Sequence, residues 1–347
     1  MFLKVQCLLA LAGNLLLANA SPLNTTRADG LPLPSKTIFQ FNETGTWLEN
    51  VAVRPNGDLL MSMLTPHSSL YTLKRPYSSS PEASLVHTFD GANGLGGITE
   101  ISPDTFAVIA GQYSGAGSPV PGTYAIWEVS FRNSTHSVRK ITDIPEAGLA
   151  NGIATVPTYG GKVVLISDSF LGSLWRLDTQ TGRYESVMKV TEMGVKDGAE
   201  FPIGINGVKV RDGYVYWTNS ALVEIFRTRI DGRGYPVSNT TVEKIATIDA
   251  PMLDDFAIDK SGLLWVATNA GDTVDIVRPN GSYKAAVGSA KEFTVAGDTA
   301  VAFGRTLRDK DILYAVTCGA LSAPINNRSE PAKVVAVDTT RFSRKLF

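Results

Sequence analysis

The sequence predicts an all-β fold, a six-bladed β-propeller built of four-stranded antiparallel blades. Three observations support this prediction. A pair of short apolar runs joined by a tight turn recurs six times in the 347 residues. The recurrences begin about 50 residues apart, which lies within the range of propeller blades. Further strand-like runs follow each pair and long helical periodicity is absent, so that each period holds two hairpins, which make one blade.

The clearest unit lies in the middle of the chain. Residues 204–210 form a short apolar run that Asn206 opens, Asp212-Gly213 supplies the turn, and residues 214–220 are β-branched and aromatic. The other five units pair residues 48–53 with 59–63, 96–101 with 105–109, 150–155 with 162–166, 254–258 with 263–268, and 299–303 with 312–316. Two β-sandwiches would have a similar length, but they would not require a polar residue or glycine at the start of each first strand.

The propeller domain is expected to cover residues 36–347. Residues 37–41 are expected to close the ring as the outer strand of the last blade, beside residues 332–337. Cys7 falls in an N-terminal leader, so Cys318 has no partner for a disulfide within the mature chain. Because Cys318 ends an apolar run, we expect a packed thiol rather than a nucleophile.

The N-terminus has the features of a secretory signal over residues 1–20. Lys4 supplies a positive charge, an apolar run follows, and Ala18-Asn19-Ala20 is a small-x-small cleavage sequence. Residues 21–35, rich in Pro, Ser and Thr, are expected to form a loose lead-in. Six Asn-x-Ser/Thr sequons agree with secretory passage and predict glycosylation at Asn24, Asn42, Asn133, Asn239, Asn280 and Asn327.

Charge and hydropathy narrow the range of partners. The net charge is −1 and no basic run is present, so nucleic acid is not an expected partner. Beyond the N-terminus no apolar run is long enough to span a bilayer. The pattern gives no indication of the oligomeric state.

In a propeller the first strands of all blades line a central channel, and their first residues encircle one mouth. Glu49, Asn151, Asn206 and Asp254 are therefore expected to converge from four blades. Loops after the second strands return to the same face and bring candidate binding residues, among them Asn219 and Asn269. Carboxylate and amide oxygens suit calcium or magnesium. Each of these residues could instead cap a turn or hold a channel water.

The order Glu49, Asn206-Gly207-Val208 and Asp254, with the strands that follow, resembles the gluconolactonase/regucalcin family of six-bladed propellers over nearly the whole mature chain. The resemblance implies that Glu49, Asn206 and Asp254 hold a divalent ion, and that Asn151 is a second asparagine of the pocket. It also implies that Asp254 serves as the base or orienting group for the attack of water on a lactone whose carbonyl the metal polarises.

The chain departs from that family at two places. Asp255 stands where the family has glycine, which could disturb an ion site, and residues 94–97 offer no polar clamp for a sugar. The expected rim of the mouth is apolar instead and consists of Trp47, Met61, Met63, Tyr113, Phe170, Met252 and Leu253. Such a rim suits a large hydrophobic small molecule.

A chain with these features resembles secreted fungal hetero-Diels–Alderases of tropolone–sesquiterpenoid biosynthesis, which join a reactive quinone methide to a terpene alkene. The resemblance implies a cycloaddition that requires no cofactor, in which Glu49, Asn151, Asn206 and Asp254 position the reactants and form hydrogen bonds. Two alternatives stay open. One is a metal-dependent lactonase, and the other is a propeller that binds a ligand without catalysis.

Overall fold

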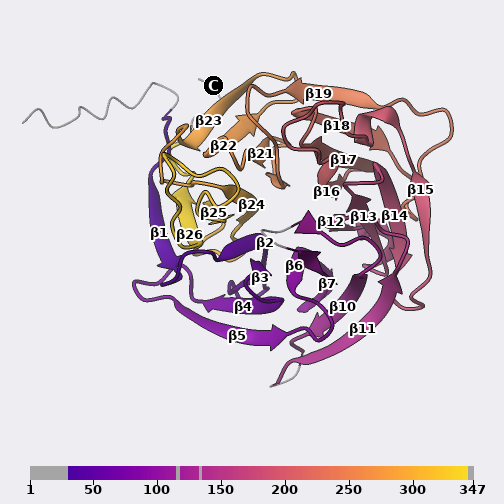
Figure 1. Cartoon of the computed structure of the whole chain (residues 1–347), viewed down its shortest axis with the longest axis horizontal. Helices are drawn as coiled ribbons and strands as arrows, with labels where there is room; N and C mark the ends of the chain where they lie inside the picture. The colour runs from indigo at the N-terminus through magenta and orange to yellow at the C-terminus, as the bar shows by residue number, and fades with distance from the viewer. Residues whose placement is uncertain (1–29, 115–117, 133–134, 343–347) are drawn as a thin grey trace, which may run out of the picture.

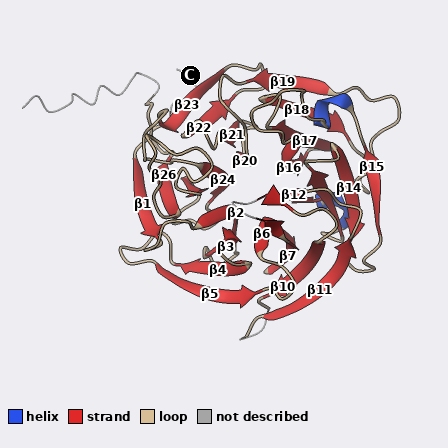
Figure 2. Ribbon diagram, in the orientation of Figure 1, coloured by secondary structure: helices blue, strands red, loops and turns tan. Residues whose placement is uncertain are grey.

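Six four-stranded antiparallel sheets form a closed ring around a central channel (Figure 1), which confirms the predicted six-bladed propeller. This computed structural model describes residues 30–342 apart from 115–117 and 133–134, so the predicted signal lies outside the described residues. Strands make up nearly all regular structure (Figure 2), and the described helices are the short 3-10 turns η1 (Pro157–Tyr159) and η2 (Thr191–Met193). None of these helices has the length and apolar character of a membrane span.

Each blade runs outward from an inner strand at the channel to an outer strand at the rim. Blade 1 contains β2 (Trp47–Val53), β3 (Leu59–Thr65), β4 (Ser69–Lys74) and β5 (Glu82–Thr88). Blade 2 contains β6 (Gly94–Ser102), β7 (Thr105–Gly111), β10 (Tyr124–Ser130) and β11 (Ser137–Ile144). Blade 3 contains β12 (Ala150–Thr155), β13 (Val163–Asp168), β14 (Ser173–Asp178) and β15 (Tyr184–Met188). Blade 4 contains β16 (Ile205–Arg211), β17 (Tyr214–Asn219), β18 (Glu224–Arg229) and β19 (Glu243–Thr247). Blade 5 contains β20 (Phe256–Ile258), β21 (Leu264–Ala267), β22 (Thr273–Val277) and β23 (Tyr283–Gly288). Blade 6 contains β24 (Asp298–Phe303), β25 (Ile312–Thr317), β26 (Lys333–Asp338) and β1 (Ser35–Gln40). A two-stranded ribbon, β8 (Tyr113–Ser114) with β9 (Ser118–Pro119), is inserted in blade 2.

Local turn chemistry fixes the hairpins. β16 and β17 pair up to Arg211 opposite Tyr214, and the two residues between them, Asp212 and Gly213, have φ values of 51° and 76°. A two-residue loop with both φ values positive matches the right-handed twist of the flanking strands, and Asp-Gly is a favoured sequence for it. The sequence prediction of this hairpin is therefore confirmed in its turn as well as in its strands.

The blades are held together by hydrophobic clusters that lie between neighbouring sheets. Blades 3 and 4, for example, share a cluster that includes Leu165, Val208 and Trp217, all buried. Blades 6 and 1 share another, in which Met61 and Met63 pack against Val316 and Val334. Because every blade buries both faces in this way, the fold requires the ring to be complete.

The two ends of the chain complete the ring. β1 pairs with β26 from Ser35 opposite Val337 to Gln40 opposite Lys333, so the predicted closure of the last blade is confirmed. Of the predicted lead-in, residues 30–35 are described, and Ser35 already begins β1. Leu31 and Leu33 are buried in the cluster between blades 5 and 6, so this part is packed against the propeller rather than loose.

Candidate active site

One mouth of the central channel opens into a cavity of about 420 Å³. All six blades contribute to its lining, which consists of Trp47, Glu49, Leu64, Tyr113, Ser118, Pro119, Leu149, Asn151, Phe170, Phe201, Pro202, Ile203, Asn206, Met252, Asp254, Asn269 and Ser322. The four polar residues predicted from four different blades, Glu49, Asn151, Asn206 and Asp254, therefore do converge at one mouth. We call this cavity the upper pocket.

β-bulges at the start of the inner strands present these side chains. In β16 the pairing passes from Ile205 opposite Asn219 to Val208 opposite Trp217, so two residues, Asn206 and Gly207, face one on β17. Asn151 in β12 and Glu49 in β2 occupy the same kind of register shift. A bulge leaves an extra residue unpaired and redirects its side chain. In this propeller it turns a polar side chain into the mouth of the channel.

A hydroxyl opposite the bulge ties each of these positions to the next blade. The Thr218 hydroxyl accepts the N–H of Gly207 at 3.0 Å and donates to the carbonyl of Asp254 at 2.7 Å. Ser167 plays the same part between Gly152 and the carbonyl of Asn206. The backbone groups that the bulges free are thereby satisfied, and the polar residues of adjacent blades are held at a fixed spacing.

Serine side chains orient the two asparagine amides. Asn206 donates its Nδ2 to the Ser220 hydroxyl at 3.0 Å, and this hydroxyl donates to the carbonyl of Leu253 at 2.6 Å. Asn151 donates in the same way to Ser169 at 3.2 Å. With the NH₂ groups directed at the serines, both asparagines keep their Oδ1 atoms for a bound molecule or ion.

Asp254 is held from behind by a chain of side chains. Asn269 donates to its Oδ2 at 2.7 Å, and Ser322 donates to the Oδ1 of Asn269 at 2.5 Å. The carboxyl is 4% exposed. Burial raises the pKa of Asp254 well above its ordinary value, the charge of Glu49 adds to this rise, and the Asn269 amide opposes it.

Glu49 lies beside the aromatic wall of the upper pocket. The indole N–H of Trp47 donates to its Oε2 at 2.6 Å. Burial raises the pKa of Glu49 to about 7, the Trp47 hydrogen bond lowers it, and the charge of Asp255 raises it further. The floor of the upper pocket therefore carries two desolvated carboxyls that favour protonation or a counter-ion.

The sequence reasoning missed Asp298, which begins β24 in blade 6, one residue before the bulge of that strand. Asp298 is fully buried, accepts the N–H of Thr268 at 3.2 Å, and has an Oδ1 atom with no hydrogen-bond partner among the described residues. Burial raises its pKa well above the ordinary value and the charge of Asp254 contributes. Its backbone carbonyl accepts the N–H of Asn269 at 3.1 Å, so it supports the chain behind Asp254. The sequence did contain a signal for Asp298, because it is a polar residue directly before the strand predicted over residues 299–303.

The walls of the upper pocket are apolar. Trp47, Tyr113, Phe170 and Met252 line it as the sequence predicts, with Phe170 at the entrance and 42% exposed. The segment Phe201-Pro202-Ile203, which enters blade 4, was not anticipated. It carries no repeat signal, because it belongs to a connection between blades and not to a hairpin.

Three predicted residues of the rim and the candidate binding residue Asn219 do not line the pocket. Met61, Met63 and Leu253 lie in clusters between blades, whereas Leu64, the neighbour of Met63, lines the pocket. Successive side chains of a strand point to opposite faces, so the prediction chose the wrong face of β3. Asn219 is also buried elsewhere. It donates to the carbonyls of Glu192 and Gly194 at 3.1 and 2.8 Å and accepts the N–H of Leu222, so it anchors a loop.

The donor set fits a hard divalent ion. In the described part of the chain no three His, Cys, Asp or Glu side chains come close enough to hold a metal. An ion in the upper pocket would therefore need the Oδ1 of Asn206 in addition to Glu49 and Asp254. The orientation of the Asn206 amide by Ser220 makes that oxygen available.

The described asparagines of the predicted sequons lie on the surface. Asn42, Asn239, Asn280 and Asn327 are exposed, whereas Asn24 and Asn133 lie outside the described residues. Cys318 is a fully buried free thiol, as expected, and burial raises its pKa to about 11.

Comparisons with known proteins agree with this architecture. Among solved structures, a luciferin-regenerating enzyme superposes with a TM-score of 0.62 at 14% identity, over 88% of this chain and 95% of that one. A calcium-binding protein, regucalcin, from Agrobacterium tumefaciens superposes with a TM-score of 0.58 at 13% identity, over 88% and 95% of the two chains. At such identities these likenesses show the fold alone.

Similarity in sequence is more specific. No family model matches the chain. A Sarocladium schorii protein described as "Putative hetero-Diels-Alderase asR5" is 32% identical over 343 residues, which cover 90% of this chain and 85% of that protein. A Phoma sp. protein described as "Putative hetero-Diels-Alderase" is 35% identical over 322 residues, which cover 85% and 89%. With a six-bladed propeller and this degree of identity over most of its length, the chain belongs to the same family as these two proteins named as hetero-Diels-Alderases.

Proposed function

We propose that this protein catalyses an intermolecular hetero-Diels–Alder cycloaddition between a quinone methide and a terpene alkene. The observation that carries the proposal is the combination of apolar walls with a polar floor in a single cavity of about 420 Å³. The names of the two relatives support the same reaction class. Apolar walls suit both reactants, because each buries mostly hydrocarbon surface in such a pocket.

The reaction joins the reactants without loss of an atom. The oxygen and the exocyclic carbon of the quinone methide bond to the two alkene carbons, so one C–O and one C–C bond form while three π bonds become one. No oxidant, reductant or leaving group is needed. Holding both reactants in contact replaces a bimolecular encounter, and effective molarities of about 10⁵ M or more are known for well-oriented groups.

Hydrogen bonding inside the upper pocket supplies the second contribution. Electron density accumulates on the quinone methide oxygen in the transition state, so a neutral donor aimed at it lowers the barrier. Tyr113 lines the pocket, and burial raises the pKa of its hydroxyl well above the usual range, which keeps the phenol protonated. Asn151 and Asn206 accept hydrogen bonds from hydroxyl groups of the reactants through their Oδ1 atoms and thereby orient them.

A metal-dependent lactonase is the second candidate, because Glu49, Asn206 and Asp254 all line the same pocket. A divalent ion bound by these three residues would polarise a substrate carbonyl. In that case Trp47 and Asn269, which hydrogen-bond to the two carboxyls, would set the orientation of the ligands.

One experiment separates the candidates. The purified protein is incubated with an alkene and a quinone methide generated in solution, with and without EDTA, and the products are resolved on a chiral column. We expect an excess of one stereoisomer over the uncatalysed mixture, insensitive to EDTA. A racemic product formed at the uncatalysed rate would refute the proposal. EDTA-sensitive release of acid from simple lactones would establish the lactonase instead.

The proposal includes passage through the secretory pathway. The exposure of Asn42, Asn239, Asn280 and Asn327 supports it, since a glycan at these positions meets no core. A decrease in mass upon endoglycosidase treatment of the protein expressed in its natural host is the expected result. An unchanged mass would contradict this part of the proposal.

A further inference from the structure

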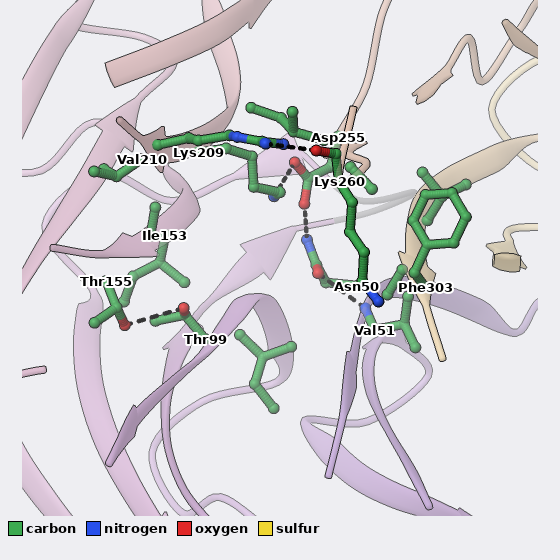
Figure 3. Close-up of a pocket in the computed structure, with 17 residues that line it drawn as sticks. Asn50, Val51, Thr99, Ile153, Thr155, Lys209, Val210, Asp255, Lys260 and Phe303 are labelled. Carbon is green, nitrogen blue, oxygen red and sulfur yellow. Dashed lines mark hydrogen bonds and ion pairs between the residues drawn. The ribbon is translucent and has the colours of Figure 1, made fainter. Parts of the chain in front are cut away.

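A second cavity occupies the other end of the channel. It has a volume of about 510 Å³ and shares no lining residue with the upper pocket. Its lining includes Asn50, Lys209 and Asp255, together with apolar residues of the inner strands such as Ile153 and Phe303 (Figure 3). We call it the lower cavity. Glu49 and Asn50, like Asp254 and Asp255, are adjacent in sequence yet belong to different cavities, so the boundary runs between them.

Three side chains meet across the channel at this boundary. Asp255 of blade 5 accepts a hydrogen bond from the Nδ2 of Asn50 in blade 1 at 2.9 Å, and it forms an ion pair with Lys209 of blade 4 (Figure 3). Blades 1 and 5 are separated in the ring by blade 6, so the contact between Asn50 and Asp255 crosses the channel itself. The three residues therefore form a bridge across the channel, at the boundary between the two cavities.

The bridge is fixed in place by its surroundings. The backbone N–H groups of Val51 and Phe256 donate to the Asn50 and Asp255 side chains at 2.9 and 2.8 Å. Asn50 is 7% exposed and Asp255 4%. A Cβ at Gly207 would lie 2.4 Å from the Oδ1 of Asp255, so the glycine provides the room that the carboxylate occupies.

Glycines complete this layer on the other side of the ring. Gly97 and Gly152 hold the positions of blades 2 and 3 that correspond to Asn50 and Asp255. A Cβ at Gly97 would lie 2.7 Å from the carbonyl oxygen of Asn151, and one at Gly152 would lie 2.5 Å from that of Asn206. The inner strands thus approach one another closely on that side of the channel.

We propose that Asp255, held by Lys209 and Asn50, seals the base of the upper pocket, so that substrates enter and products leave by one mouth only. The consequence for chemistry rests on the proposed cycloaddition. Water adds to the exocyclic carbon of a quinone methide, with its proton passing to the carbonyl oxygen, and the product is a benzylic alcohol. A sealed base restricts the supply of water to a pocket whose entrance the alkene occupies.

The first test is structural and independent of the reaction. Crystal structures of the wild-type protein and of the Asp255→Gly variant are compared for ordered water in the channel. We expect a continuous file of water between the two cavities in the variant and an interrupted one in the wild type. A continuous file in the wild type, or none in the variant, would overturn the seal. If Asp255→Gly fails to fold, Asp255→Ser replaces it, because serine is too short to reach Asn50.

The second test measures the ratio of benzylic alcohol to cycloadduct at fixed quinone methide and alkene. Asp255→Gly should raise this ratio about threefold or more without changing the KM for the alkene, since the seal excludes water and does not bind substrate. Asp255→Asn, which retains the volume and can accept from Asn50, should keep the wild-type ratio. An unchanged ratio in folded Asp255→Gly would overturn the role in catalysis. If the wild-type protein forms no cycloadduct, the proposed function fails while the structural test still decides the seal.

Discussion

Asp275 should make the protein less stable at neutral pH than at acid pH. Its side chain lies in the middle of β22, it is 5% exposed, and its Oδ1 has no hydrogen-bond partner among the described residues. Burial raises the pKa of Asp275 from 3.8 to about 6, although the Thr273 side chain opposes the rise. A raised pKa means that the folded state binds the proton more tightly than the unfolded state does. The resulting stabilisation is present below pH 4 and is lost as the pH rises to about 6.

The size of the effect follows from that difference in pKa. Between 3.8 and about 6 it corresponds to about 3 kcal/mol of folding free energy at full ionisation. Asp275→Asn keeps the shape of the side chain and removes the ionisation. We therefore expect the variant to exceed the wild type in Tm by about 6 °C at pH 7.5, and by much less at pH 4.

The measurement is thermal unfolding followed by circular dichroism at several pH values between 4 and 8. Asp212→Asn is the matched control, because Asp212 lies in an exposed turn at a positive φ that asparagine also accepts. Its Tm difference from the wild type measures the effect of an Asp→Asn substitution at an exposed position, outside the core. If Asp275→Asn lowers Tm by the same amount at pH 4 and pH 7.5, the reasoning from desolvation is refuted.

Three further predictions concern the channel and the ring. Gly207→Ala should cost about 3 kcal/mol by urea unfolding because its Cβ meets Asp255, whereas Gly91→Ala, at φ +78° in open space, should cost only about 1 kcal/mol; equal costs would contradict the clash. Ser220→Ala frees the Asn206 amide to rotate and removes a hydrogen bond to the carbonyl of Leu253, so it should lower kcat of the cycloaddition about tenfold and lower Tm by a few degrees; an unaltered kcat would show that the orientation is not needed. Deletion of residues 35–40 uncovers the edge of β26 and should lower Tm and promote self-association in size-exclusion chromatography, so a monomer of wild-type Tm would count against ring closure by this strand.

The position of each blade could be predicted from the sequence because the signals are local. Asp212-Gly213 specifies a two-residue hairpin, and the β-branched and aromatic residues around it specify strands. The polar residues Asn151 and Asn206 could be predicted too, since a repeat places equivalent positions at one mouth. Their bulges and the serines that orient them follow the same period.

Two kinds of feature depended on tertiary structure. The first is the face of a strand that meets the pocket, which separated Leu64 from Met63, because β3 is mostly apolar and its two polar residues show no alternation. The second is contact between residues far apart in the chain. Asn50 and Asp255 are 205 positions apart, and nothing near either one indicates that they meet across the channel. The sequence by itself determined the repeating blade and the residues that open it, because turns and strand patterns act over a few residues. Only the closed ring decided which side chains face the pocket, which pack between blades and which seal the channel, because those outcomes depend on how six sheets pack around one axis.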